Sequence, residues 1–140
     1  MARIRITALT VDALAVAALV ILLAACGGGR VGALSAEQYN AAPLTVAIPG
    51  GTANAVVIDA AEQALTGRGW RVVSMSDDEI VGKLVHRNYD ATVAIRIEGS
   101  QAVLCSDATI QSADTDGPTP AVPYGWLKNL KSDMETNLAQ

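Results

Sequence analysis

The strongest constraint on the fold is a segment in which apolar and mostly polar residues alternate along the chain. Its apolar positions are Tyr89, Ala91, Val93, Ile95 and Ile97, and the residues between them are Asp90, Thr92, Ala94, Arg96 and Glu98. Because successive side chains of a strand point to opposite faces, this alternation predicts a strand with one buried face and one face in water. A strand of this kind needs neighbouring strands and a layer that covers its apolar face.

Neighbouring strands are predicted on both sides of this segment. They cover residues 44–48, 70–75, 80–87 and 102–110. The connections between successive strands are short and polar, as at residues 76–79 and 99–100. Short connections predict an antiparallel meander, because parallel strands need a long crossover.

Two helices are predicted to cover the sheet. Residues 53–66 place Val57, Ile58, Ala61, Ala64 and Leu65 on one face. Thr52 is predicted to cap this helix, and Gly67 to end it. Near the end of the chain, Leu127, Leu130, Met134 and Leu138 form an apolar stripe at helical spacing. The predicted fold class is α+β: a two-layer domain with an antiparallel sheet of about 4–5 strands and two helices on one face.

The first 25 residues are predicted to be a signal peptide. Arg3 and Arg5 precede a continuous apolar run from Ala13 to Leu23, which is too short for a permanent membrane helix of about 20 residues. The run ends in Leu23-Ala24-Ala25-Cys26, followed by three glycines. This segment resembles the lipobox of bacterial lipoprotein precursors, which implies cleavage before Cys26 and a lipid on its sulfur. The alternative is an ordinary secretory signal in which Cys26 has no role.

The remaining chain is predicted to have two parts. Residues 26–42 are expected to form the lipidated N-terminus and a flexible tether, and residues 43–140 a single α+β domain. Without residues 1–25 the chain keeps 8 basic and 13 acidic side chains, a net charge of −5. This charge argues against nucleic acid as a partner. Gly27 stands where an Asp would favour the inner membrane, so by resemblance to that sorting rule the outer membrane is favoured, with the domain facing the periplasm.

A second resemblance covers residues 52–139. Its landmarks are Arg68-Gly69-Trp70, the alternating strand from Tyr89, and Trp126-Leu-Lys-Asn-Leu-Lys-Ser-Asp-Met134. In this combination the chain resembles a group of small proteobacterial lipoproteins that face the periplasm. Members of the group often have a histidine at the place of Tyr89 and an asparagine at that of Tyr124. The resemblance supports the predicted architecture and implies no particular activity.

Catalytic residues are scarce. Acylation of Cys26 would leave Cys105 without a partner, so Cys105 is expected to be a small buried apolar residue, with a reactive thiol as the alternative. His86, the one histidine, is expected to be structural or to lie at the surface. A nucleophile and base made of Cys105 and His86 would need these residues to touch. We predict that the protein is not an enzyme.

Three short motifs are expected to be turns or loops. Pro49-Gly50-Gly51-Thr52 could hold a phosphate before a helix, but no lysine follows the glycines. Residues 114–117 share a fragment with calcium-binding loops but lack the distal glutamate. Asp77, Asp78 and Glu79 are expected to form a solvated turn. The sequence therefore predicts no metal site and no cofactor.

The aromatic residues suggest where a partner could bind. Trp70 and Trp126 are expected to contribute to the core, while Tyr124 and Trp126, next to a proline-rich loop, form the candidate partner surface. The expected function is a lipid-anchored binding or assembly module of the cell envelope. The alternative is an inhibitor or small-ligand-binding lipoprotein that uses the loop at residues 112–123. An enzyme is the least favoured class.

Overall fold

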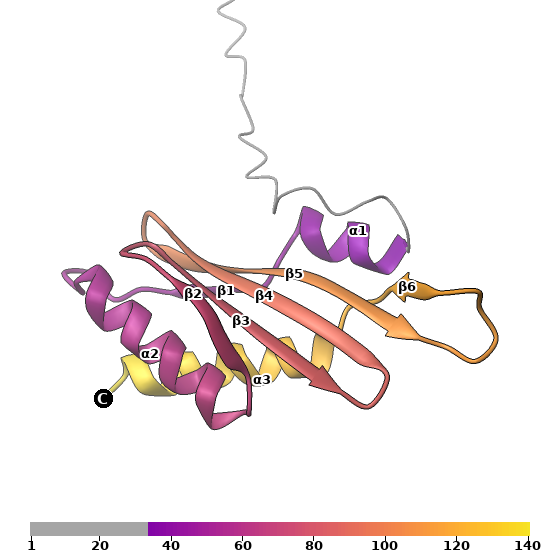
Figure 1. Cartoon of the computed structure of the whole chain (residues 1–140). Helices are drawn as coiled ribbons and strands as arrows, with labels where there is room; N and C mark the ends of the chain where they lie inside the picture. Colours follow the sequence, from indigo (N-terminus) through magenta and orange to yellow (C-terminus); the bar gives the residue numbers. More distant parts are fainter. Residues whose placement is uncertain (1–33) are drawn as a thin grey trace, which may run out of the picture.

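The computed structural model describes residues 34–140, so Cys26 and the predicted signal peptide lie outside the described residues (Figure 1). The described chain has nine elements. In order they are α1 (Leu34–Ala41), β1 (Thr45–Ala47), α2 (Asn54–Gly67), β2 (Arg71–Met75), β3 (Glu79–His86), β4 (Tyr89–Glu98), β5 (Gln101–Gln111), β6 (Pro118–Pro120) and α3 (Tyr124–Leu138).

The strands form one antiparallel sheet in the order β1-β5-β4-β3-β2, and β6 also pairs with β5. The α+β class and the antiparallel meander from β2 to β5 are therefore confirmed. The described sheet has six strands because the predicted loop at residues 112–123 contains β6. Pro118 and Pro120 fit this edge position, since proline has no N–H to offer a further strand.

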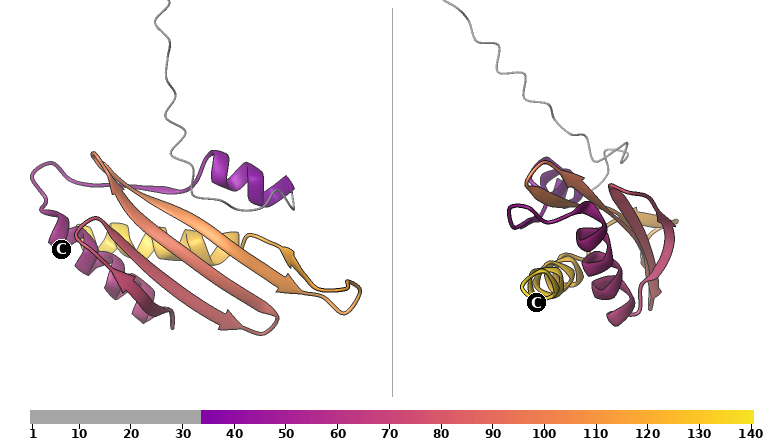
Figure 2. Two further views of the ribbon diagram at one scale, coloured as in Figure 1. Left: turned by 45° about the horizontal axis from the view of Figure 1, so that its top comes forward. Right: turned by 90° about the vertical axis from the view of Figure 1, so that its left-hand side faces the viewer.

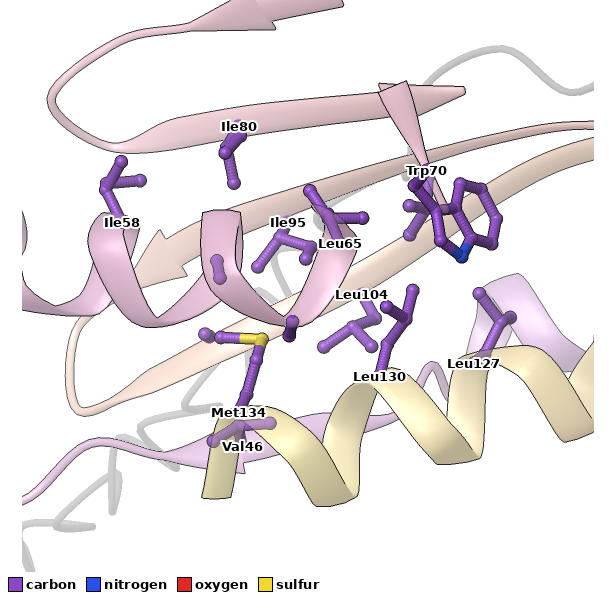
Figure 3. Close-up of a cluster of buried hydrophobic side chains, with 14 of the residues drawn as sticks. Val46, Ile58, Leu65, Trp70, Ile80, Ile95, Leu104, Leu127, Leu130 and Met134 are labelled. Atoms are coloured by element: carbon purple, nitrogen blue, oxygen red, sulfur yellow. The ribbon is translucent and has the colours of Figure 1, made fainter. Parts of the chain in front are cut away.

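The core lies between the sheet and the helices α2 and α3. Val93 and Ile95 of the alternating strand are almost fully buried, as predicted, and they belong to one cluster with Leu65 of α2 and with Leu130 and Met134 of α3 (Figure 3). Figure 2 shows α2 and α3 side by side, on the same side of β2 and β3. Burial of these side chains is the main contribution to folding.

The predicted N-cap of α2 needs correction, whereas its predicted end does not. Ala53, and not Thr52, is the N-cap, and no side chain caps the helix. At the other end the N–H of Trp70 bonds to the carbonyl of Leu65 at 2.9 Å, and that of Gly69 to Thr66 at 3.1 Å. This pair of bonds needs a left-handed residue, and Gly69 supplies it with φ of +79°. The helix ends at Gly67, as predicted, and Gly69 makes the turn that follows it.

Helix α1 also corrects the sequence prediction. Its residues fall within the predicted flexible tether, but they form a helix at the β5 edge of the sheet (Figure 1). The Tyr39 side chain is buried, and its hydroxyl donates a hydrogen bond of 2.6 Å to the Leu104 carbonyl of β5. The tether prediction is wrong for Leu34–Ala41. Within residues 34–140, no helix is both long and apolar enough to cross a membrane.

Candidate functional site

The clearest candidate site is a cluster of rings around Trp126 in the first turn of α3. The ring of Trp70 lies 6.3 Å from that of Trp126, the ring of His86 at 5.9 Å and that of Tyr89 at 5.2 Å, measured between centroids. The Trp70 and His86 rings meet Trp126 edge to face, a favourable geometry for aromatic pairs. We call these four residues the aromatic cluster.

Three distant parts of the sequence build the aromatic cluster. The turn that ends α2 places Trp70 at the start of β2. His86 and Tyr89 face each other across the hairpin between β3 and β4, whose turn consists of Arg87 and Asn88. Residues paired directly across a hairpin project from the same face of the sheet, so both rings reach Trp126.

The hairpin turn is fixed at two points. Arg87 has φ of +54°, an uncommon conformation for a residue with a side chain. Asn88 is tied to the end of β5, because its side-chain amide donates to the Gln111 carbonyl at 3.0 Å and the Gln111 N–H donates to the Asn88 carbonyl at 2.8 Å. These bonds hold the His86 and Tyr89 end of the hairpin in position over α3.

A pocket of about 260 Å³ opens beside the cluster. Its lining residues are Arg68, Trp70, Leu84, His86, Trp126 and Asn129. Trp70 is only 3% exposed, whereas Trp126 is partly exposed and His86 and Asn129 are exposed. The pocket therefore combines aromatic and apolar walls with a polar rim, a combination typical of binding pockets.

The charge at the rim is held by an ion pair between α2 and α3. Arg68 donates two hydrogen bonds to the Asp133 carboxylate, at 2.6 Å and 3.0 Å. These bonds, together with the positive charge of Arg68, keep the pKa of Asp133 below its ordinary value. They fix the Arg68 guanidinium beside the pocket, and no carboxylate is among the lining residues. The Asp133 carboxylate offsets the Arg68 charge, so the rim carries a fixed ion pair with no net charge.

The two residues of the predicted partner surface lie in different surroundings. Trp126 is the centre of the aromatic cluster, whereas Tyr124 packs edge to face against Tyr39 of α1 at 6.2 Å. Tyr124 is 52% exposed, and the Lys128 ammonium lies 5.9 Å from its ring centroid. The sequence identified Trp126 but missed His86 and Tyr89. The signal for them was the short hairpin turn, which makes these two residues a cross-strand pair.

Cys105 and His86 do not form a catalytic pair. Leu104 and its cross-strand partner Ile95 both belong to the core. Since adjacent residues of a strand point to opposite faces, the Cys105 side chain is on the face of the sheet opposite to the core. His86 instead contacts Trp126. His86, the one histidine of the sequence, therefore cannot act as a base for the Cys105 sulfur.

Cys105 also differs from its prediction in bonding. It is buried, as expected, but it is disulfide-bonded in the structure, so the expectation of an unpaired thiol is wrong. The other cysteine of the sequence, Cys26, lies outside the described residues. A cysteine sulfur forms either a disulfide or a thioether to lipid. The bonding of Cys26 is therefore the measurement that decides whether it is lipidated.

Two of the three residues of the predicted solvated turn lie in the turn between β2 and β3, where Asp78 accepts a hydrogen bond from Ser76. The prediction is wrong for Glu79, which begins β3 and pairs with Arg96 of β4. The Thr115 hydroxyl bonds to the Gly117 carbonyl within the loop that resembled a calcium site. Among residues 34–140, no group of three or more His, Cys, Asp or Glu side chains is arranged to hold a metal ion.

Comparisons with known proteins find no relative of this chain. No protein-family model, no curated protein and no solved structure matches this chain. The function is therefore argued from the sequence and from the geometry of the site alone.

Proposed function

We propose that the mature chain is a lipid-anchored protein of the cell envelope that binds a protein partner through the aromatic pocket. One observation carries the binding part of this proposal. The partly exposed Trp126 ring is contacted by three other rings and lines an open pocket. Preorganised aromatic residues of this kind lose little conformational entropy when a partner docks.

The size and rim of the pocket favour a protein partner over a free small molecule. Its volume of about 260 Å³ is below the range of about 300–1,000 Å³ that is usual for sites enclosing a whole ligand. A pocket of this size suits one apolar side chain from a larger surface. Trp and Arg are also enriched among the residues that dominate protein–protein binding energy. Trp126 and Arg68 would therefore anchor the partner.

The anchor is proposed from the N-terminal sequence. Two or more acyl chains at Cys26 would hold the protein firmly at a bilayer, which a single chain does not. Gly27 favours the outer membrane over the inner one by the sorting rule described above. A tethered domain meets a partner in the same membrane at a raised effective concentration, so even a modest pocket can support binding.

Site-specific photocrosslinking in intact cells tests the pocket. A photoreactive amino acid replaces the exposed Asn129 at the rim, and the same amino acid at Asp107, on the face of the sheet opposite to the core, serves as the matched control. We expect a discrete protein adduct at position 129 that Trp126→Ala abolishes. Equal adducts at both positions, or none at position 129, would contradict the proposal. His86→Ala, an exposed change that leaves the core intact, should also weaken the adduct.

Mass spectrometry of the purified N-terminal peptide tests the anchor. The proposal expects cleavage before Cys26 and diacylglycerol on its sulfur, and it expects Cys26→Ala to lose both. Recovery of a peptide in which Cys26 is joined to Cys105 by a disulfide would exclude lipidation of that sulfur. The pocket proposal would survive that result, because none of its residues depends on either cysteine.

A further inference from the structure

A second surface lies at the other end of α2, away from the aromatic pocket. Strand β2 is an edge of the sheet, since it pairs only with β3. A groove of about 700 Å³ runs between the end of β2 and the N-terminal half of α2. It is lined by Asn54, Ala55, Ile58, Asp59, Glu62, Met75, Ser76 and Asp77.

The backbone at this edge is directed outward. The Ser76 N–H donates to the Glu79 carbonyl at 2.8 Å, so residue 76 points its backbone groups toward β3. Backbone groups of adjacent residues in a strand point in opposite directions. The N–H and carbonyl of Met75 therefore face the free edge. A register shift between Val72 and Ser74 interrupts the strand, so the regular part of this edge is short.

The side chains give the groove an apolar floor. Met75 pairs with the fully buried Ile80 and so projects from the same face, yet it remains 47% exposed. Ile58 of α2 lies beside it in the groove lining. An exposed methionine next to a free strand edge suits an apolar side chain from an added segment.

The rim of the groove is acidic. Asp59 and Glu62 line it from α2, and Asp77 lines it from the turn after β2, while no basic side chain is among the lining residues. Among these carboxylates, Asp59 accepts a hydrogen bond of 2.8 Å from the neutral amide of Gln63, which leaves its charge in place. The groove therefore presents three negative charges to whatever occupies it.

From this geometry we infer that the groove binds an extended, basic polypeptide segment of another protein. The segment adds to β2 as a short strand, bonds to the Met75 backbone, and places lysine or arginine side chains against Asp59, Glu62 and Asp77. A second copy of this chain is a poorer occupant, because pairing two β2 edges would bring two acidic grooves together. An anionic lipid surface is repelled for the same reason.

The probe is a fluorescent peptide in which lysine and valine alternate, and it is titrated with the purified protein. We expect saturable binding by anisotropy at low salt, weakened as salt rises. A peptide that alternates glutamate and valine should not bind. Methylation of every backbone nitrogen of the lysine peptide should abolish binding, because it removes the donors from both edges of the peptide and so leaves none for strand addition.

Charge variants locate the site. Asp59→Asn combined with Glu62→Gln should weaken peptide binding by about 3- to 10-fold, as expected for two exposed ion pairs. The matched control is Asp114→Asn combined with Asp116→Asn, which makes the same change in net charge in the loop before β6, far from the groove (Figure 1). If both double variants weakened binding equally, the effect would come from the overall charge of the protein, and the inference would be overturned.

A backbone variant tests strand addition directly. Met75→Pro removes an N–H that faces away from β3, and it should weaken binding more than Met75→Ala does. Equal affinities of these two variants, or undiminished binding of the methylated peptide, would refute strand addition. If the protein dimerised and Met75→Pro abolished the dimer, the β2 edge would bind a second copy of this chain, and the inference would be wrong. Trp126→Ala should leave peptide binding unchanged, which separates this groove from the proposed function of the aromatic pocket.

Discussion

Gly82 of β3 lies directly beneath Leu65 of α2. A Cβ atom added at Gly82 would lie 2.7 Å from Leu65 Cδ2 and 3.2 Å from Cδ1. Leu65 is fully buried, so its side chain has little room to move away. The glycine therefore sets how closely the helix approaches the sheet.

Gly82→Ala is expected to lower the free energy of unfolding by about 1–3 kcal/mol, because overpacking a filled core costs this much. Urea unfolding measures the change. Gly50→Ala is the control, since an added Cβ there meets no atom within 4 Å and the residue has no positive φ. In the background of Leu65→Val the cost of Gly82→Ala should shrink, and a purely additive double mutant would argue against this contact.

Among the elements, α1 depends on one side chain. Burial raises the pKa of the Tyr39 hydroxyl to about 12, from an ordinary value of 10.0. The folded protein thus holds this proton more tightly than the unfolded chain does. The corresponding stability is fully present below pH 10 and is lost as the pH rises toward 12.

Tyr39→Phe should reduce stability by about 1–3 kcal/mol at neutral pH, because it leaves the Leu104 carbonyl without its buried donor. The variant should also lose stability less steeply than the parent between pH 10 and pH 12. Urea titrations at several pH values measure both effects. Parallel pH profiles for the two proteins would mean that this hydroxyl does not titrate with folding.

The helices and strands differ in how well the sequence predicts them. Strand β4 was predictable because its alternation matches the two faces of a strand but not the 3.6-residue turn of a helix, and its neighbours were predictable from the short polar connections between them. Helix α1 was not predictable, because its two large apolar residues, Leu34 and Tyr39, are not at helical spacing and leave no periodic signal. The C-terminal end of α2 was predictable from Gly67, but only the backbone bonds of Trp70 show that Gly69 makes the left-handed turn after it.

At the scale of the whole molecule, the candidate site depends on contacts between segments that are distant in the sequence. The aromatic cluster joins the end of α2, the hairpin of β3 and β4, and the start of α3. Sequence patterns placed each of these elements but could not give their relative positions. The pocket therefore emerged only from the packed structure, whereas a local motif such as the predicted lipobox needs no knowledge of packing.

The same packing predicts how the domain unfolds. One core cluster includes side chains from α1, α2, α3 and strands β1, β3, β4 and β5, so no element has a separate core of its own. Such a domain should unfold in one cooperative transition. Trp70 and Trp126 report on the aromatic cluster by fluorescence, and far-ultraviolet circular dichroism reports on all elements. We expect the two signals to have the same midpoint in urea. An earlier fluorescence transition would mean that α3 and the hairpin separate first, and it would then make the pocket a locally unstable region of the fold and not a preorganised binding site.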